Sequence, residues 1–461
     1  MNAVLLIDFG STFTKVTAVD LENERILGTA KSFTTVNTDI NEGLVEAVNI
    51  LSSKIGKIEF KEKYACSSAA GGLKMIAVGL VPELTAEAAK RTALSAGAKV
   101  MKVYSYGLNK SEIEEIKTMK PDIVLLTGGT DGGDFKSILH NAKMIGTIEE
   151  TFPIVVAGNK TYADKVADIL IKSGKEVKIT ENVMPRLNEL NIDSARKAIR
   201  EIFLRRIIQA KGFTEVKSLI EGILMPTPSA VLKAASLLSK GTSTEEGIGE
   251  LMVVDIGGAT TDVHSLANGE PTKTGVYIKG LKEPFEKRSV EGDLGVRYSA
   301  KALVDALGLE LVSKESKINK NEIIELIKKI EESPEIIAEE DKLKDLDFVL
   351  GYLAAKTAVE RHVGTIETQY TPFGTAYLQD GKDLTNIKYV VGTGGPIINS
   401  SNSKGILEKI LFEKENPTVL KPIDPEFLLD KKYILAAMGL LGEKYPEKAI
   451  RIMKKEIEKI N

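Results

Sequence analysis

The stretch that decides the fold lies at residues 7–15, IDFGSTFTK, and a second version of it lies at residues 254–262, VDIGGATTD. Each version consists of an apolar strand that ends in an aspartate, a turn of small residues, and a second strand. Glycines in such a turn let the backbone approach an anion closely, and consecutive N–H groups can form an anion-binding nest. One such turn is usually an ordinary β-turn, but two copies on apolar strands indicate a shared phosphate-binding role.

The two turns supply the candidate groups for binding a phosphate and a metal ion. Their hydroxyl groups can donate to phosphate oxygens, and an aspartate at a strand end can hold a hydrated Mg²⁺, which keeps most of its water. Lys15 can reach a phosphate as a point charge, although a solvated strand lysine fits the sequence equally well. The candidate residues are Asp8, Gly10, Ser11, Thr12, Asp255, Gly257, Gly258, Thr260 and Thr261.

A third glycine-rich element lies at residues 390–397, VVGTGGPI. A strand that ends in Gly394, Gly395 and Pro396 lets a flat base and ribose lie against the backbone. The stretch LLTGGTD at residues 125–131 looks much the same, so this motif is not decisive alone. The order of the elements favours residues 390–397, because they follow the two phosphate turns.

The segment between the two turns has its own pattern. Within residues 85–190, apolar runs alternate with helical segments, which is typical of a parallel sheet covered by helices. We interpret this segment as an inserted Rossmann-like α/β domain. The polar stretch GTSTEEGIGE, at residues 241–250, indicates a domain boundary before the second phosphate turn.

The composition excludes several classes of protein. The 461 residues include 62 Lys and Arg and 65 Asp and Glu, so the net charge of -3 gives no basic surface for nucleic acid. The single cysteine, Cys66, excludes an internal disulfide framework and a cysteine-ligated cluster within one chain. No apolar run reaches the roughly 18 residues of a membrane span, and the N-terminus lacks the basic region of a signal peptide. We therefore expect a cytoplasmic protein without nucleic-acid or membrane partners.

The order of these motifs resembles that of the actin, Hsp70 and sugar-kinase superfamily. The resemblance implies an α/β protein with a duplicated actin-like (ribonuclease H-like) ATPase fold, which binds ATP or ADP and Mg between two lobes. In that superfamily the motifs are named phosphate-1, connect-1, phosphate-2, adenosine and connect-2, and here they match residues 8–15, 225–240, 253–263, 390–397 and 433–442.

The same resemblance assigns roles to individual residues. It implies that Asp8 and Asp255 are catalytic and position Mg²⁺ and the attacking water, with Asp262 in the outer shell of the metal. Gly292, within EGDLG at residues 291–295, resembles the glycine loop that opens a helix near the phosphates in Hsp70-like members. A plain helix entry explains Gly292 nearly as well.

The resemblance also implies a division of the chain into lobes. The expected parts are residues 1–84 (first lobe, first part), 85–190 (inserted domain), 191–245 (first lobe, second part, with the connect-1 helix), 246–430 (second lobe, with a peripheral helical subdomain at about 305–347) and 431–461 (connect-2 helices that return to the first lobe).

More narrowly, the sequence resembles the component L accessory proteins encoded with adenosylcobalamin-dependent glutamate mutase. This resemblance implies an ATP-driven reactivating chaperone whose partners are subunits of a B12-dependent aminomutase, and which is not a mutase itself. The inserted domain is open to interpretation as a second nucleotide domain or a cobalamin domain. It lacks an Asp-x-His-x-x-Gly run for a cobalt-ligating histidine, which disfavours cobalamin binding of that kind, and we favour a protein-docking module. The matching segments span nearly the whole chain: IDFGSTFTK, SSAAGGLKM, LLTGGTDGG, PTPSAVL, DIGGATTDVHS, EGDLGVR, AVERHVGTIE and VGTGGPII.

Two other functions remain open on the same fold. A small-molecule kinase would need an aspartate directed at its substrate, and no motif identifies one. A filament-forming actin-like protein would assemble in the presence of ATP. The related activators of acyl-CoA dehydratases carry a cluster ligated by cysteines between subunits, and the single Cys66 argues against that class. The sequence does not indicate the oligomeric state.

Overall fold

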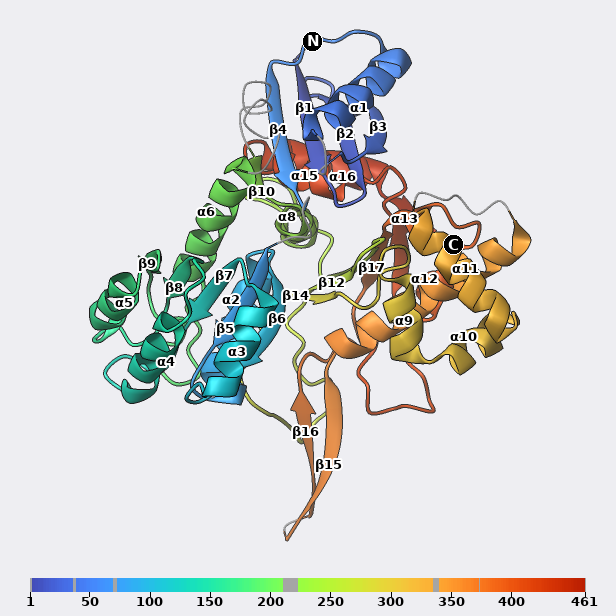
Figure 1. Ribbon diagram of the computed structural model, residues 1–461. Helices are drawn as coiled ribbons and strands as arrows, with labels where there is room; N and C mark the ends of the chain where they lie inside the picture. The colour runs from blue at the N-terminus through green and yellow to red at the C-terminus, as the bar shows by residue number, and fades with distance from the viewer. Residues whose placement is uncertain are drawn as a thin grey trace.

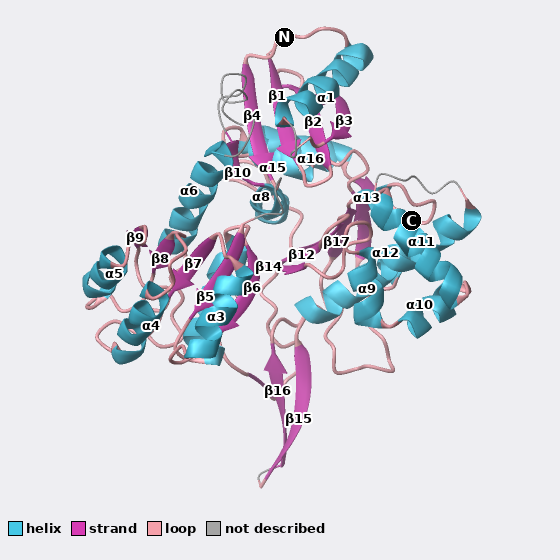
Figure 2. Ribbon diagram, in the orientation of Figure 1, coloured by secondary structure: helices cyan, strands magenta, loops and turns pink. Residues whose placement is uncertain are grey.

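Four β-sheets organise the protein (Figure 1). The computed structural model describes residues 2–35, 39–68, 73–209, 223–334, 340–372 and 374–460. Two of the sheets form the cores of two lobes, the third belongs to an inserted domain, and the fourth forms a projecting ribbon. Figure 2 shows that helices surround all three of the larger sheets.

The sheet of the first lobe has the strand order β10-β4-β1-β2-β3. Strands β1 to β3 form an antiparallel meander, and β4 and β10 continue the sheet in parallel with β1. Every residue of β1 is buried, because α1 covers one face of the sheet and α15 the other. The bounds are β1 Ala3–Phe9, β2 Phe13–Asp20, β3 Arg25–Phe33, α1 Ile40–Ile55, β4 Glu62–Ser67 and β10 Ile223–Pro226.

The sheet of the second lobe repeats this order. Its strands run β14-β12-β11-β17-β18-β19, with an antiparallel meander followed by two strands parallel to the first. Two copies of one strand order, each with the aspartate at the end of its first strand, confirm the duplicated ribonuclease H-like fold of actin-like ATPases. The bounds are β11 Leu251–Ile256, β12 Thr261–Leu266, β14 Glu286–Glu291, β17 Tyr389–Thr393, β18 Glu426–Leu429 and β19 Glu458–Lys459.

Two helices at the centre of the molecule join the lobes. Helix α8 (Thr227–Lys240) follows β10, and α15 (Leu435–Leu441) follows β18, so each leaves the fifth strand of one lobe. Both pack in one apolar cluster with α16 (Pro446–Glu456) and with side chains from β1 and β11. The two sheets are therefore in contact through these helices.

The inserted domain is a parallel sheet with the order β6-β5-β7-β8-β9. The domain begins before the predicted residue 85, because β5 already pairs with β6 and β7. The short run of β5 directly follows a glycine-rich stretch, which concealed it as a strand. The strands are β5 Lys74–Val78, β6 Lys99–Tyr104, β7 Ile123–Leu126, β8 Ile154–Val156 and β9 Val177–Ile179.

Helices cover both faces of this sheet. Helices α2 and α6 pack on the face that joins the core of the first lobe, and α3, α4 and α5 pack on the other face. A π-helical turn, η2, leads into α2. The bounds are η2 Pro82–Ala86, α2 Glu87–Ser95, α3 Lys110–Met119, α4 Lys136–Gly146, α5 Ala163–Lys172 and α6 Asp193–Gln209.

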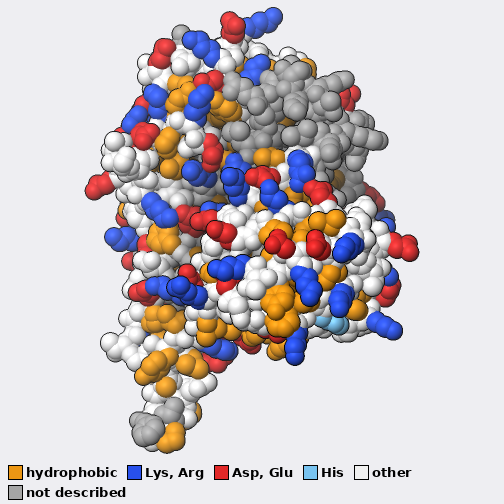
Figure 3. Space-filling model, turned by 90° about the vertical axis from the view of Figure 1, so that its left-hand side faces the viewer, with side chains coloured by type: hydrophobic (Ala, Val, Ile, Leu, Met, Phe, Trp, Pro, Cys, Tyr) orange, Lys and Arg blue, Asp and Glu red, His pale blue; other side chains and the backbone are white. Residues whose placement is uncertain are grey.

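The second lobe carries a helical layer and a projecting ribbon. Helix α12 (Asp341–His362) packs against the sheet, and α9 (Ala300–Leu307), α10 (Leu309–Ser316) and α11 (Lys320–Glu332) pack around it. The ribbon consists of β13 (Val276–Ile278), β15 (Thr365–Thr371) and β16 (Gly374–Asp380). Figure 3 shows hydrophobic side chains on this projection, where Tyr370 is 87% exposed. Two short helices, α13 (Gly395–Ile398) and α14 (Ser403–Glu408), follow β17. Among the described helices, none combines the length and the apolar character needed to cross a bilayer.

The crossing of α8 and α15 gives a first prediction. A Cβ atom on Gly439 would lie only 2.5 Å from the carbonyl carbon of Ala230, so Gly439→Ala must push the two helices apart. We expect the free energy of unfolding to fall by about 1–3 kcal/mol, as overpacking usually costs. Gly351→Ala on α12 is the matched control, because its nearest neighbours would lie at 3.5 Å, an ordinary contact. Chemical denaturation of both variants checks this, and equal stability of the two would contradict it.

Candidate nucleotide site between the lobes

The two predicted turns meet where the lobes face each other. A Cβ atom placed on Gly258 would lie 3.4 Å from the Thr12 hydroxyl, so the two turns face each other at close range. The Lys15 Nζ lies 3.4 Å from Asp8 Oδ2 and 3.5 Å from the centre of the Tyr433 ring. The Tyr433 hydroxyl in turn lies 3.5 Å from Asp255 Oδ1. The structure thus brings Asp8 and Lys15 of the first motif close to Asp255 of the second.

The two turns have the same local geometry. In the first, the N–H of Gly10 donates to the carbonyl of Phe13 at 3.1 Å, and in the second that of Gly257 donates to Thr260 at 2.8 Å. A Cβ on either glycine would approach the same carbonyl to 2.7 or 2.8 Å, so only glycine fits. This shared constraint explains why both motifs place a glycine directly at this point.

The second turn is held from behind by the segment that follows β14. The carbonyls of the turn, at residues 257–259, accept hydrogen bonds from the N–H groups of Val296 and Arg297 and from the Ser299 hydroxyl. Among the described residues, no acceptor bonds the N–H groups of Gly258 and Ala259, which stay available for an anion. The turn is therefore a rigid donor pair, as an anion-binding nest requires.

Two of the predicted phosphate contacts have structural explanations instead. Thr261 is fully buried, and its hydroxyl donates to the carbonyl of Leu294 at 2.7 Å, so this hydroxyl is already used within the lobe. Gly292 lies against the inserted domain, since a Cβ there would be 2.6 Å from Lys99 Nζ. Ser11 and Thr12 keep at least partial exposure, which leaves their hydroxyls better placed for a ligand. Thr260 is also partly exposed, but its hydroxyl already donates to Asp262 Oδ2 at 3.1 Å.

Negative charge is concentrated at the junction. Burial and the nearby Asp262 carboxylate raise the pKa of Asp255 to about 7, and Lys15 offsets part of this rise. Burial also raises the pKa of Asp430, although the N–H groups of Ile434 and Leu435 donate to its carboxylate at 2.8 and 3.1 Å. An excess of desolvated carboxylates over cations is the electrostatic setting in which a divalent cation binds.

Asp8 is better satisfied than Asp255. The Thr227 hydroxyl, at the start of α8, donates to Asp8 Oδ1 at 2.6 Å, and Lys15 lies beside Oδ2. Cys66 Sγ lies 3.5 Å from Asp8 Oδ1. Burial, together with the Asp8 charge, raises the pKa of the Cys66 thiol well above its usual value, so this residue is a protonated core side chain.

Asp262 is engaged by protein groups on both oxygens. The Arg288 Nε donates to Oδ1 at 2.8 Å, and the Thr260 hydroxyl donates to Oδ2 at 3.1 Å. Across the described part of the chain, no three His, Cys, Asp or Glu residues gather closely enough to hold a metal ion directly. A hydrated Mg²⁺ needs fewer direct ligands, so the metal contacts of Asp8, Asp255 and Asp262 stay predictions.

The predicted adenosine loop joins β17 to α13. Gly394 has φ +95°, and a Cβ there would lie 2.7 Å from the amide nitrogen of Ile256 on β11. Gly394 is thus required for close packing of the loop on the strand that carries Asp255. Gly395 has no such restriction, and Pro396 occupies the first turn of α13. A base contact through Gly395 and Pro396 stays a prediction.

Comparison with known proteins identifies the family. The family model described as MutL protein matches residues 4–457. Protein MutL from Clostridium tetanomorphum is 54% identical over 462 residues, which cover all of both chains. The chain belongs to the MutL protein family. This confirms the resemblance to the glutamate mutase accessory proteins.

Solved structures resemble the MutL-family chain only distantly. An activator of 2-hydroxyisocaproyl-CoA dehydratase from Clostridium difficile with bound ADPNP shares 11% identity, covers 100% of this chain and 99% of its own, and has a TM-score of 0.32. A gluconate kinase from Lactobacillus acidophilus shares 10%, with 100% and 93% covered and a TM-score of 0.34. These scores are low, and the fold assignment rests on the strand order of the two sheets.

Sequence reasoning missed three residues of this MutL-family site. Thr227, Asp430 and Tyr433 contact the predicted groups, yet none lies in a motif for phosphate or metal. Tyr433 has φ +56°, a conformation that non-glycine residues rarely adopt and that is concentrated at functional sites. Thr227 and Tyr433 nevertheless lie in the segments matched to connect-1 and connect-2, at residues 225–240 and 433–442, and each follows the fifth strand of a lobe.

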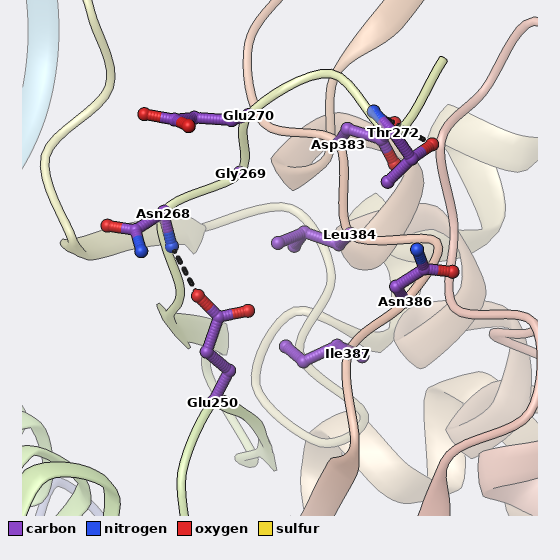
Figure 4. Close-up of a pocket in the computed structure, with 9 residues that line it drawn as sticks. All are labelled: Glu250, Asn268, Gly269, Glu270, Thr272, Asp383, Leu384, Asn386 and Ile387. Atoms are coloured by element: carbon purple, nitrogen blue, oxygen red, sulfur yellow. Dashed lines mark hydrogen bonds between the residues drawn. The ribbon is translucent and has the colours of Figure 1, made fainter.

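A separate cavity of about 160 Å³ lies in the second lobe (Figure 4). Its acidic side chains are satisfied internally: the N–H of Asn268 donates to Glu250 Oε1 at 2.9 Å, and Thr272 donates twice to Asp383. None of the candidate nucleotide-binding residues lines it. This cavity is thus distinct from the junction of the two turns.

The raised pKa of Asp255 gives a second prediction. Because the folded protein holds this proton more tightly than the unfolded chain, the group costs stability as the pH rises from about 4 to about 7. Asp255→Asn should remove that loss, so the variant gains on the order of 2–4 kcal/mol over the parent protein by pH 7 and no more above it. Urea denaturation across this range measures the difference. Asp380→Asn, on the exposed ribbon, is the control, and a difference that does not depend on pH would refute the prediction.

Proposed function

We propose that this protein is a Mg-ATP-dependent accessory factor that reactivates an adenosylcobalamin-dependent glutamate mutase or a related aminomutase. The observation that carries the proposal is the pair of matching turns, one from each lobe, which meet at Asp8, Lys15 and Asp255. Membership of the MutL family supports the choice of mutase as partner. ATP would bind between the lobes and drive their movement, and the lobes would transmit it to the partner.

The chain's own groups fit a nucleotide triphosphate. The N–H groups of Gly258 and Ala259 and the hydroxyls of Ser11 and Thr12 would hold phosphate oxygens. Lys15, already beside Asp8, would add a positive charge. Gly395 and Pro396 would lie against the base. These contacts would fix the terminal phosphate in line with a water, and phosphoryl transfer relies mainly on such positioning and charge.

The carboxylates also fit a magnesium ion. Asp8 and Asp255 would hold its water ligands, and the bound ion would neutralise charge on the phosphate oxygens. Asp255 Oδ1 would accept a proton from the attacking water, since the Tyr433 hydroxyl, at 3.5 Å, holds this oxygen only weakly. Asp262 would orient the second turn through Thr260 and contact the metal only through water.

The third prediction tests nucleotide binding and hydrolysis. Calorimetry with Mg²⁺ should show saturable binding of ATP and ADP, and phosphate release should need no added substrate. Asp255→Asn should lower the hydrolysis rate by about 10²–10⁴-fold while the Kd for ADP changes less than about tenfold. Unchanged turnover would remove Asp255 from the mechanism, and absence of binding would reject the proposal. Phosphorylation of a metabolite would favour the small-molecule kinase.

The fourth prediction concerns the partner. Glutamate mutase inactivated with a cobalamin that lacks the adenosyl group should regain activity when the protein, ATP, Mg²⁺ and fresh adenosylcobalamin are added together. Omission of ATP, or use of Asp255→Asn, should prevent the recovery, and a non-hydrolysable analogue separates binding from hydrolysis. Recovery that proceeds equally without the protein or without ATP would contradict a reactivating role.

A further inference from the structure

Arg288, on β14, connects the second phosphate turn with the inserted domain. Its Nη2 lies 2.6 Å from Asp262 Oδ1, while its Nη1 donates to the carbonyls of Leu94 at 3.1 Å and Ala98 at 3.2 Å. The Arg288 side chain is only 3% exposed. One buried guanidinium therefore joins a group beside the candidate nucleotide site to a helix end in another domain.

Of the two carbonyls that Arg288 contacts, that of Leu94 lies in the last turn of α2, and that of Ala98 lies in the turn between α2 and β6. The last carbonyls of a helix lack partners within the helix and carry the negative end of its dipole. Arg288 thus faces negative charge on both sides, from the Asp262 carboxylate and from the helix end. Loss of either contact would leave a buried charge with half of its compensation, so the two contacts depend on each other.

On the other side, Asp262 belongs to the nucleotide turn. Its Oδ2 accepts from the Thr260 hydroxyl, one of the candidate phosphate donors, at 3.1 Å. A phosphate that recruited this hydroxyl, or a cation that approached the carboxylate through water, would change the charge that Arg288 faces. A turn with a bound nucleotide would therefore interact with Arg288 differently from an empty one.

The turn after α2 is also in contact with the start of α8, one of the two helices that join the lobes. A Cβ on Gly97, in the turn after α2, would lie 2.8 Å from Pro226 and 2.7 Å from the Ser229 hydroxyl, at the start of α8. On α2 itself, the Arg91 Nη2 lies 3.2 Å from a carboxylate oxygen of Glu283. Helix α2 lies beside β14 (Figure 1).

We propose that Arg288 is a positioning residue that couples nucleotide binding at the second turn to the placement of α2, and through α2 to the inserted domain; this rests on the proposed nucleotide site. The coupling uses the forked geometry of the guanidinium, which bonds a carboxylate with one edge and two carbonyls with another. A lysine ammonium, as a single point on a flexible stem, does not reproduce this span.

The experiment is amide hydrogen exchange of the full-length protein, measured at residues 87–104 with and without Mg-ADP. In the parent protein, Mg-ADP should change exchange in this segment by about twofold or more. Arg288→Lys should still bind Mg-ADP by calorimetry but lose at least half of that change. The matched control is Arg91→Lys, which alters another arginine contact of α2 without touching Asp262, and it should keep the nucleotide-dependent change.

Each outcome decides the inference. Mg-ADP binding without any change at residues 87–104 in the parent protein, or an undiminished change in Arg288→Lys, would overturn the coupling and leave the proposed function standing. Absence of Mg-ADP binding in the parent protein would reject the proposed function itself. If Arg288→Lys does not fold, Asp262→Asn weakens the same contact from the other side, and it should reduce the change at residues 87–104 in the same way.

Discussion

The desolvated carboxylate of Asp255, placed beside Asp262, Asp430 and Asp8 and near Lys15, is the constraint on which the junction of the lobes depends. Proteins do not bury such a group without cost, since burial disfavours its charged form. The surrounding groups offset this cost in different ways. The N–H groups at the start of α15 bond Asp430, and the ring of Tyr433 lies between Lys15 and Asp255. The unusual φ of Tyr433 persists because these contacts determine its position.

The two lobes use the same topology to satisfy their carboxylates unequally. In each lobe, the residue that contacts the aspartate on the first strand comes just after the fifth strand. Thr227 donates to Asp8 at 2.6 Å, whereas Tyr433 reaches Asp255 only at 3.5 Å. The Asp8 carboxylate is therefore held by a short hydrogen bond, whereas the Asp255 carboxylate has a long and weak one. The two lobes therefore share a strand order but hold the aspartates on their first strands differently.

The sequence predicts those features whose residues are adjacent in the chain, and it does not predict contacts between distant segments. The two turns were found because strand, aspartate and glycine are adjacent in sequence. Strand β5 was missed because five residues after a glycine-rich stretch carry little pattern. Asp430, Tyr433 and Arg288 could not be found, since their roles arise only when distant segments pack together. Thr261 and Gly394 lie in the expected segments. However, the Thr261 hydroxyl bonds the backbone carbonyl of Leu294, and the backbone of Ile256 fills the space beside Gly394.

The position of the inserted domain in the chain explains how it can respond to both lobes. The domain leaves the first lobe after β4 and returns at β10, and these two strands are adjacent and parallel in the sheet. Cys66 of β4 pairs in register with Asp8, so the exit point lies beside the first carboxylate. Helix α2 contacts the second lobe through Arg288. A body attached to one lobe and bonded to the other must shift relative to at least one of them whenever the lobes move, so hinge motion cannot leave its placement unchanged.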